Sequence, residues 1–518
     1  TISLDGTYGS FLTIMGPVSL DAAVNTNLYL RSGGAITLGG AVTSGTDPNL
    51  RIHAGTTLSG PSLGSLGAVT AGVGSSINLY AGNSSDLTNP FRFTTIDAGA
   101  TGFVTINAPA GIVQTLASGS GGGVTAGTVS LSASGTGSKI EGPSDIASLP
   151  LTLRETFDLT LYSGGSVNIN RDGASGAPLL SNLDITRSST FASFGLTGFV
   201  AGQAVTINSD SVGGGTSVDV VNTSATPLNF SYRNYDGVNG NLTGTGIATK
   251  GGNLYLYASD NLTTGAIDTK SGSAPTVPDG SIQLYAGQSL SASGTVDSGA
   301  STIYAQGTSI TGAGPLVSTS EATLYALNGN IGVNTAGGDV QINAPTVSLA
   351  ASGGVSSGNG NVYAALTGTT GLTINADEGF RVSSTVPLTT VDLTTEGTGR
   401  TGPVELTTTG AQSFGLARNG AAVDITGVTS TLALSSFSLN MGTGDITVKG
   451  SVAADTLTLS ANGGTLTLDG STSALTLANA TQQFSAGTLA IQGNVTANAT
   501  SSQSMTAYTA FGFTGTGT

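Results

Sequence analysis

The 518-residue chain is 38% hydrophobic but only 8% charged, and its 14 basic and 29 acidic residues give a net charge of −15. This composition is too apolar for a disordered chain, and the negative charge opposes binding to nucleic acid or to an anionic membrane surface. The lack of cysteine excludes disulfides and zinc–thiolate sites, and the lack of an 18-residue apolar run predicts no membrane insertion.

The N-terminal part already shows a repeated strand phrase. Residues 28–38 match residues 159–169 at nearly every apolar and glycine position. Apolar and polar residues alternate within the phrase, which predicts strands with one buried face. The residue after the buried aliphatic defines an outward-facing column, which we expect to contain Arg31, His53, Tyr80, Asn107, Ser132, Tyr162, Asn208, Tyr257, Tyr285, Tyr304, Tyr325, Asn343 and Tyr363.

Residues 170–250 are predicted to form a less regular, loop-rich section, because the alternation thins there and aromatic residues lie outside the repeated phrase. Within it, residues 230–236 form the densest aromatic and charged cluster of a chain poor in both. We predict a surface binding or packing role for Tyr232, Arg233, Tyr235 and Asp236. A binding loop and a packed flap both fit this cluster.

The clearest repeat covers residues 254–363, where an aliphatic-Tyr-Ala phrase returns about every twenty residues. One copy cannot bury its own apolar face, so successive copies must stack. The predicted fold is all-β: a single long right-handed parallel β-helix, or β-solenoid, over 1–518 with an irregular insertion near the middle. Tyr257, Tyr285, Tyr304 and Tyr325 are predicted to share one face, where they could stack on sugars, pack against a neighbouring rod or stabilise each other.

Both ends of the chain keep the strand pattern. We expect the apolar side chains there to make end-to-end contacts between copies, with residues 505–518 as an end-pairing strand or tail. The residues concerned are Ile2, Leu4, Met505, Tyr508, Phe511 and Phe513. The open alternative is that the chain is a segment of a longer protein whose caps lie elsewhere.

Acidic residues give little support for catalysis or metal binding. Asp268 and Asp297 lie one repeat apart, and Val317 takes the corresponding place in the next repeat. Two carboxylates without a third ligand make a weak cation site. The only histidine, His53, lies in the outward column. We therefore expect no enzyme activity, no cofactor and no metal requirement for folding.

The phrases at residues 252–258, 280–287 and 339–344 resemble the shaft repeats of filamentous haemagglutinin-type exoproteins, the secreted partners of two-partner secretion systems. The resemblance covers most of the chain. It implies a right-handed β-helix exported by a Gram-negative bacterium and used in adhesion or as an extracellular fibre.

The sequence thus predicts an extracellular structural or adhesive β-solenoid, a filament subunit or fibre shaft at a bacterial surface. Its expected partners are other copies of itself, joined head to tail or laterally, and cell-surface glycans. The alternative is a carbohydrate-binding or carbohydrate-cleaving β-helix, similar to a polysaccharide lyase, a hydrolase or a phage tailspike.

Overall fold

The computed structural model describes residues 2–6, 11–19, 27–43, 49–54, 58–59, 65–82, 89–116, 122–143, 149–172, 178–189, 194–209, 215–224, 226–236, 240–272, 277–353, 359–386, 388–395, 404–408, 412–419, 422–430, 434–452 and 454–514. These residues form two compact units. Unit 1 comprises Thr1–Asp260 and Thr269–Gly280, and unit 2 comprises Asn261–Asp268 and Ser281–Thr518.

The described residues are all-β, and no helix occurs among them. Most neighbouring strands are parallel, so the prediction of an all-β fold with parallel pairing is confirmed. In this part of the chain nothing has the helical length and apolarity needed to cross a membrane.

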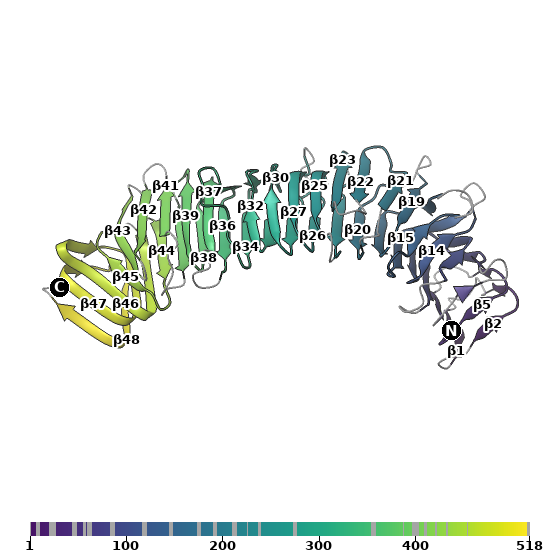
Figure 1. The fold of residues 1–518 in the computed structure, drawn as a ribbon, viewed down its shortest axis with the longest axis horizontal. Helices are drawn as coiled ribbons and strands as arrows, with labels where there is room; N and C mark the ends of the chain where they lie inside the picture. Colours follow the sequence, from purple (N-terminus) through teal and green to yellow (C-terminus); the bar gives the residue numbers. More distant parts are fainter. Residues whose placement is uncertain are drawn as a thin grey trace. The chain divides into compact units, whose positions relative to one another are not determined.

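The longest series of unit 1, called here the Tyr80 series, contains strands that each pair in parallel with the next. They are β1 (Ile2–Asp5), β4 (Leu28–Ser32), β7 (Asn49–Ala54), β11 (Ser76–Ala81), β13 (Thr95–Asn107), β15 (Gly123–Ala133), β18 (Asp158–Ser163), β20 (Asn182–Arg187), β24 (Asn229–Asn234) and β26 (Leu254–Ala258). In Figure 1 neighbouring strands of this unit lie side by side.

Three shorter parallel series complete most of unit 1. One contains β9 (Ser65–Leu66), β12 (Phe91–Phe93), β14 (Gly111–Gln114), β16 (Lys139–Glu141), β19 (Val167–Arg171) and β21 (Phe194–Thr197). Another runs through β3 (Val18–Ser19), β6 (Val42–Thr43) and β10 (Val69–Thr70) to β13, and β17 (Leu151–Arg154) pairs with both β15 and β19. The third is a separate sheet of β2 (Leu12–Ile14), β5 (Ile36–Leu38) and β8 (Leu58–Ser59).

Unit 2 is built in the same way from two main series. The first contains β28 (Ile282–Ala286), β31 (Ile303–Gly307), β34 (Glu321–Ala326), β36 (Thr346–Ala351), β38 (Gly371–Ala376), β40 (Thr390–Thr395), β44 (Leu434–Asn440), β46 (Ala454–Leu477), β47 (Thr481–Ala497) and β48 (Ser502–Thr514). The second contains β27 (Leu262–Asp268), β30 (Val296–Asp297), β33 (Leu316–Val317), β35 (Val340–Asn343), β37 (Asn361–Thr367), β39 (Gly379–Ser384) and β41 (Val404–Thr408).

The remaining strands of unit 2 attach to these two series. β29 (Ser289–Ala292) pairs with β27 and with β32 (Ser309–Thr311). β42 (Gln412–Asn419) lies antiparallel to both β41 and β43 (Ala422–Ser430), and β45 (Asp445–Val448) joins β43 to β46.

The core of each unit consists of aliphatic rows that run from strand to strand. In unit 1, Leu28, Leu50 and Ile77 are register partners and are all buried. Parallel strands lie about 4.8 Å apart, so each side chain stacks on its equivalent one repeat away. At the turns some positions require glycine: Gly312 has a φ of +126°, and a Cβ there would lie 2.0 Å from the Ala292 carbonyl oxygen.

The predicted outward column is confirmed over its first six members. Arg31, His53, Tyr80, Asn107, Ser132 and Tyr162 are consecutive register partners. The next partners along unit 1 are Thr186, Arg233 and Tyr257. Asn208 is not in this column, because it lies on an antiparallel hairpin.

In unit 2 the predicted column is wrong at three positions. The partner of Tyr285 is Gln306, whose next partner is Tyr325, so Tyr304 lies one outward position away from that row. Asn343 and Tyr363 belong to the second series, and Tyr363 is buried. The error arises because shifting a strand by two residues against its neighbour leaves the same side chains on the same face. The apolar–polar alternation therefore does not show how many residues each turn contains, and the row in which a residue lies stays undetermined.

Residues 170–250 contain the one departure from parallel pairing among the described residues of unit 1. β22 (Gln203–Ser209) and β23 (Thr216–Asn222) form an antiparallel hairpin, and β23 pairs in parallel with β25 (Leu242–Ala248). The strands of this hairpin do not enter the Tyr80 series. β20 pairs directly with β24, although the residues between the two strands are numerous enough for another repeat.

The buried rows and the outward positions predict opposite responses to substitution. Leu284 is fully buried and Tyr285 is only partly buried. Leu284→Asp should lower the urea midpoint of unfolding strongly, because an unpaired buried carboxylate costs several kcal/mol, on the order of 3 or more. Tyr285→Ser should change that midpoint little. Equal destabilisation by both substitutions would contradict the register.

Candidate functional site

The aromatic and charged cluster predicted near residue 230 lies on three neighbouring strands of unit 1. β20, β24 and β26 place Asp184, Ser231 and Tyr255 in one row and Thr186, Arg233 and Tyr257 in the next. Buried and outward residues alternate along β24 and β26, whereas the last three residues of β20, Ile185, Thr186 and Arg187, are all buried. We call the surface formed by Asp184, Arg233, Tyr235, Tyr255 and Tyr257 the Arg233 face.

Arg233 is fixed at the centre of this face by two interactions. Its Nη1 donates a hydrogen bond to Asp184 Oδ1 in a salt bridge, and its guanidinium lies 4.7 Å from the centroid of the Tyr255 ring. The hydrogen bond to Asp184 raises the pKa of Arg233. Burial, partly offset by the positive charge of Arg233, raises the pKa of Tyr255.

Two tyrosines extend the Arg233 face beside the arginine. The rings of Tyr235 and Tyr257 have centroids 4.7 Å apart at an interplanar angle of 38°, and Tyr235 is 47% exposed. A cation and several aromatic rings thus share one surface. Such a surface can stack on a planar or apolar face of a ligand, including the C–H face of a sugar ring.

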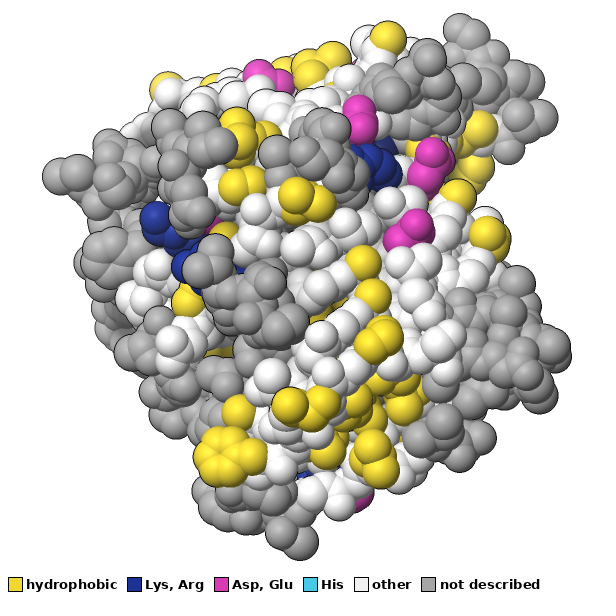
Figure 2. Space-filling view, turned by 90° about the vertical axis from the view of Figure 1, so that its right-hand side faces the viewer, with side chains coloured by type: hydrophobic (Ala, Val, Ile, Leu, Met, Phe, Trp, Pro, Cys, Tyr) yellow, Lys and Arg dark blue, Asp and Glu magenta, His cyan; other side chains and the backbone are white. Residues whose placement is uncertain are grey.

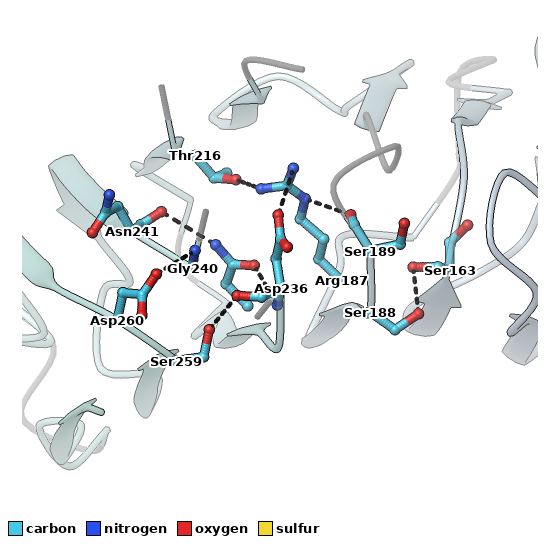
Figure 3. Close-up of polar contacts among 11 residues, drawn as sticks. Ser163, Arg187, Ser188, Ser189, Thr216, Asp236, Gly240, Asn241, Ser259 and Asp260 are labelled. Carbon is cyan, nitrogen blue, oxygen red and sulfur yellow. Dashed lines mark hydrogen bonds and ion pairs between the residues drawn. The ribbon is translucent and has the colours of Figure 1, made fainter. Parts of the chain in front are cut away.

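A buried polar cluster lies behind this face, and Figure 3 shows its contacts. The side chains of Arg187 and Asp236 are 0% and 3% exposed and form an ion pair with an Nη2–Oδ2 distance of 3.6 Å. Arg187 also donates from Nη1 to Thr216 Oγ1 at 2.7 Å and from Nε to the Ser189 carbonyl at 3.1 Å. These bonds tie β20 to the β22–β23 hairpin and to the segment after β24.

The segment after β24 is held by its own hydrogen bonds. The Asp236 amide donates to Asn234 Oδ1 at 3.2 Å, and the Ser259 hydroxyl donates to the Asp236 carbonyl. Asn234 Nδ2 donates to the Asn241 carbonyl at 3.2 Å. Asp236 is thereby held in the interior beside Arg187.

The structure separates the four predicted residues of this cluster. Arg233 and Tyr235 lie on the surface, whereas Tyr232 and Asp236 are buried and cannot meet a ligand there. Burial raises the pKa of Tyr232 to about 12. Its ring packs edge-on against Phe194 with centroids 6.2 Å apart, so Tyr232 has a packing role.

Several residues of this region were missed from the sequence, although a signal exists. Asn182, Asn229 and Asn253 each precede an apolar residue of their strand, and they form a ladder. Asn229 Nδ2 donates to Asn182 Oδ1 at 2.7 Å, and the Asn253 amide donates to Asn229 Oδ1 at 2.9 Å. The repeated Asn could have aligned these strands and so revealed Asp184 and Tyr255.

The predicted tyrosine column divides between the two units. Tyr257 belongs to the Arg233 face of unit 1. In unit 2 the Tyr285 and Tyr304 rings lie 5.4 Å apart, and the Tyr304 hydroxyl donates to Gln306 Oε1 at 2.9 Å. Burial and the neighbouring Tyr325 raise the pKa of Tyr304, and the Tyr325 side chain is exposed.

The predicted acidic pair is present in unit 2. Asp268 and Asp297 are register partners on β27 and β30, and the next partner is Val317. Asp297 Oδ1 accepts a hydrogen bond from the Gly299 amide at 2.9 Å. Across the described residues no three His, Cys, Asp or Glu side chains gather into a group that could hold a metal ion.

The residues predicted to make end-to-end contacts lie on β1 and β48. Ile2 and Leu4 belong to β1, and Leu4 is 43% exposed. The other four, Met505, Tyr508, Phe511 and Phe513, belong to β48. Tyr508 and Phe511 are exposed, and Met505 is partly exposed.

Comparison of the chain with protein-family models, with curated proteins and with solved structures found no match.

The buried and exposed ion pairs of unit 1 should respond differently to loss of one charge. Asp236→Asn leaves Arg187 buried without its counter-charge and should reduce the free energy of unfolding by about 3–5 kcal/mol. Asp184→Asn, the matched control, removes a half-exposed partner and should cost about 1 kcal/mol or less. Urea denaturation followed by circular dichroism measures both. Equal losses would show that the Arg187–Asp236 pair is not a buried structural link.

Proposed function

We propose that the chain is a structural β-solenoid, built from right-handed parallel coils, that serves as a subunit or shaft segment of an extracellular fibre. The observation that carries this proposal is the continuous register within each unit, in which buried aliphatic rows pass from strand to strand. Beyond a few coils, a stack of this kind can be extended to any length, because each coil contacts only its neighbours. The proposal includes no catalytic step.

The edge of β48 supports assembly through strand pairing. Among the described residues β48 pairs only with β47. Two core rows continue onto β48: Leu459 and Phe484 lead to Met505, and Leu466 and Leu489 lead to Phe511. Phe511 is 58% exposed, whereas its row partners Leu466 and Leu489 are fully buried. A further parallel strand on this edge would cover Phe511 and complete the row.

The edge of β1 in unit 1 also exposes an apolar side chain that continues a buried row. Leu4 continues the row of Leu30, Ile52 and Leu79, all of which are buried, yet Leu4 itself is partly exposed. Hydrophobic side chains gather over the lower part of the face seen in Figure 2, on the side where the first strands lie. The proposed occupant of the β48 edge is β1 of a second copy, a head-to-tail contact that propagates as a filament.

The composition and the resemblance to filamentous haemagglutinin-type repeats support a place outside the cell, at a bacterial surface. Only 8% of the residues are charged, and the chain is rich in small polar residues. Such a composition suits a secreted fibre, because it limits nonspecific electrostatic binding to other molecules. Adhesion through glycans is a second candidate function. The stacked arginine and tyrosine rings of the Arg233 face favour it, because aromatic surfaces bind sugar rings.

Point substitutions on β48 test the filament proposal. Phe511→Asp places a charge in the exposed core row and should abolish end-to-end assembly while leaving circular dichroism unchanged. Tyr508→Asp is the matched control. The sequence predicted Tyr508 as an end-to-end contact, but its side chain is 65% exposed and lies at the register shift, outside the core rows that a further strand would extend. Sedimentation velocity and negative-stain electron microscopy report assembly.

A monodisperse monomer at high concentration, or fibres unchanged by Phe511→Asp, would contradict head-to-tail joining. In a longer chain, the β48 edge would instead be covered by the next coil of the same molecule. Phe511→Asp would then destabilise the monomer, and no filament would form in either protein.

A further inference from the structure

The first four strands of the Tyr80 series carry a hollow that no earlier prediction includes. β1, β4, β7 and β11 enclose a surface depression of about 350 Å³. Its walls include two arginines, two tyrosines, the only histidine and one carboxylate: Arg31, Arg51, Tyr29, Tyr80, His53 and Asp5. All of these lie in unit 1.

Strand register brings these side chains together in two outward rows. Asp5, Arg31, His53 and Tyr80 are consecutive partners in one row. Tyr29 and Arg51 are partners in the next row, two residues earlier along the strands. Arg31 lies on β4 and Arg51 on the adjacent strand β7, in rows about 6–7 Å apart along the strand, and both line the hollow.

The hollow is electropositive although the chain as a whole is acidic. Burial, followed by the positive charges of Arg31 and Arg51, lowers the pKa of His53 below its ordinary 6.5. Both guanidinium charges thus disfavour the imidazolium form of His53. No salt bridge joins Arg31 or Arg51 to a carboxylate in the described part of the chain.

Aromatic rings form a wall of the same hollow. The His53 and Tyr80 rings stack with centroids 5.5 Å apart and an interplanar angle of 24°. Tyr29 lies in the neighbouring row, beside Arg51. Aromatic rings beside guanidinium groups that have no ion-pair partner among the described residues suit a ligand with both an apolar ring face and an anionic group.

We propose that this hollow binds a carboxylated sugar, a uronate unit of an acidic polysaccharide. Arg31 and Arg51 donate hydrogen bonds to the carboxylate, a group whose geometry matches the guanidinium fork. The His53–Tyr80 pair and Tyr29 contact the C–H face of the ring. Asp5 accepts a hydrogen bond from a sugar hydroxyl. The site residues lie on the outward side of the strands, and of those named only Asp5 belongs to β1, the strand proposed to pair in the filament.

Calorimetric titration of the full chain with an oligogalacturonate of defined length tests the site. Arg51→Gln and Arg31→Gln should each weaken binding tenfold or more, because each removes a charged donor to the carboxylate. Arg92→Gln is the matched control: Arg92 lies on β12, in another series of unit 1, and its loss should not change the affinity. The neutral galactose oligomer should bind at least tenfold more weakly than the uronate.

The single histidine gives a second readout at the hollow itself. An NMR titration of His53 should show a midpoint below 6.5 in the free protein and a higher midpoint in Arg51→Gln, with no change in Arg92→Gln. Saturation with the uronate should also raise the midpoint, because the carboxylate favours the imidazolium. The charged groups that line the hollow with His53 are Arg31 on β4, Arg51 on β7 and Asp5 on β1.

Four results would overturn the proposal. One is the absence of uronate binding to the full chain at millimolar concentration, and another is equal binding of the neutral sugar. A third is unchanged affinity in both arginine variants. Competition by inorganic phosphate at the same affinity would show a simple anion site and would exclude the sugar. Filament formation is measured separately, so its failure leaves this test intact.

Discussion

Backbone pairing between equivalent parallel strands is the interaction on which the structure depends. Each strand of a series satisfies the amides and carbonyls of its neighbours, and this fixes the register to the residue. Because side chains alternate, the same register decides which positions are core and which are surface. Buried rows such as Leu28, Leu50 and Ile77 and outward rows such as Arg31, His53 and Tyr80 are two consequences of one pairing pattern.

This constraint explains where candidate sites arise on the surface of unit 1. Outward rows bring residues together that are 20 to 50 positions apart in the chain. The Arg233 face and the Arg31–Arg51 hollow both form in this way, from side chains on successive strands of unit 1. The buried Arg187–Asp236 pair has a structural role, because it links the inserted β22–β23 hairpin to the strands that continue the series.

Much of the fold could be predicted from the sequence, because strand alternation and a repeat near twenty residues are local signals. The first six members of the outward column and the Asp268–Asp297 pair were placed correctly. Tyr304, Asn343 and Tyr363 were misplaced because turn lengths and a second strand series are invisible to a period-two pattern. Asp184 depends on strand pairing across an insertion, which only the Asn182, Asn229 and Asn253 ladder indicates in the sequence. The Arg31–Arg51 hollow could not be predicted from spacing, since it depends on which outward rows lie side by side.

Engineered disulfides test the parallel register most directly, and the chain offers a clean background because it contains no cysteine. Ser348 and Thr373 are register partners on β36 and β38, and Asn375 lies two residues further along β38 on the same face. The account predicts that the Ser348→Cys, Thr373→Cys protein forms an intramolecular disulfide under mild oxidation, because paired Cα atoms of adjacent strands lie about 5 Å apart. The Ser348→Cys, Asn375→Cys protein should stay reduced. A disulfide in the second protein but not in the first would contradict the register on which the core rows, the surface sites and the proposed assembly all rest.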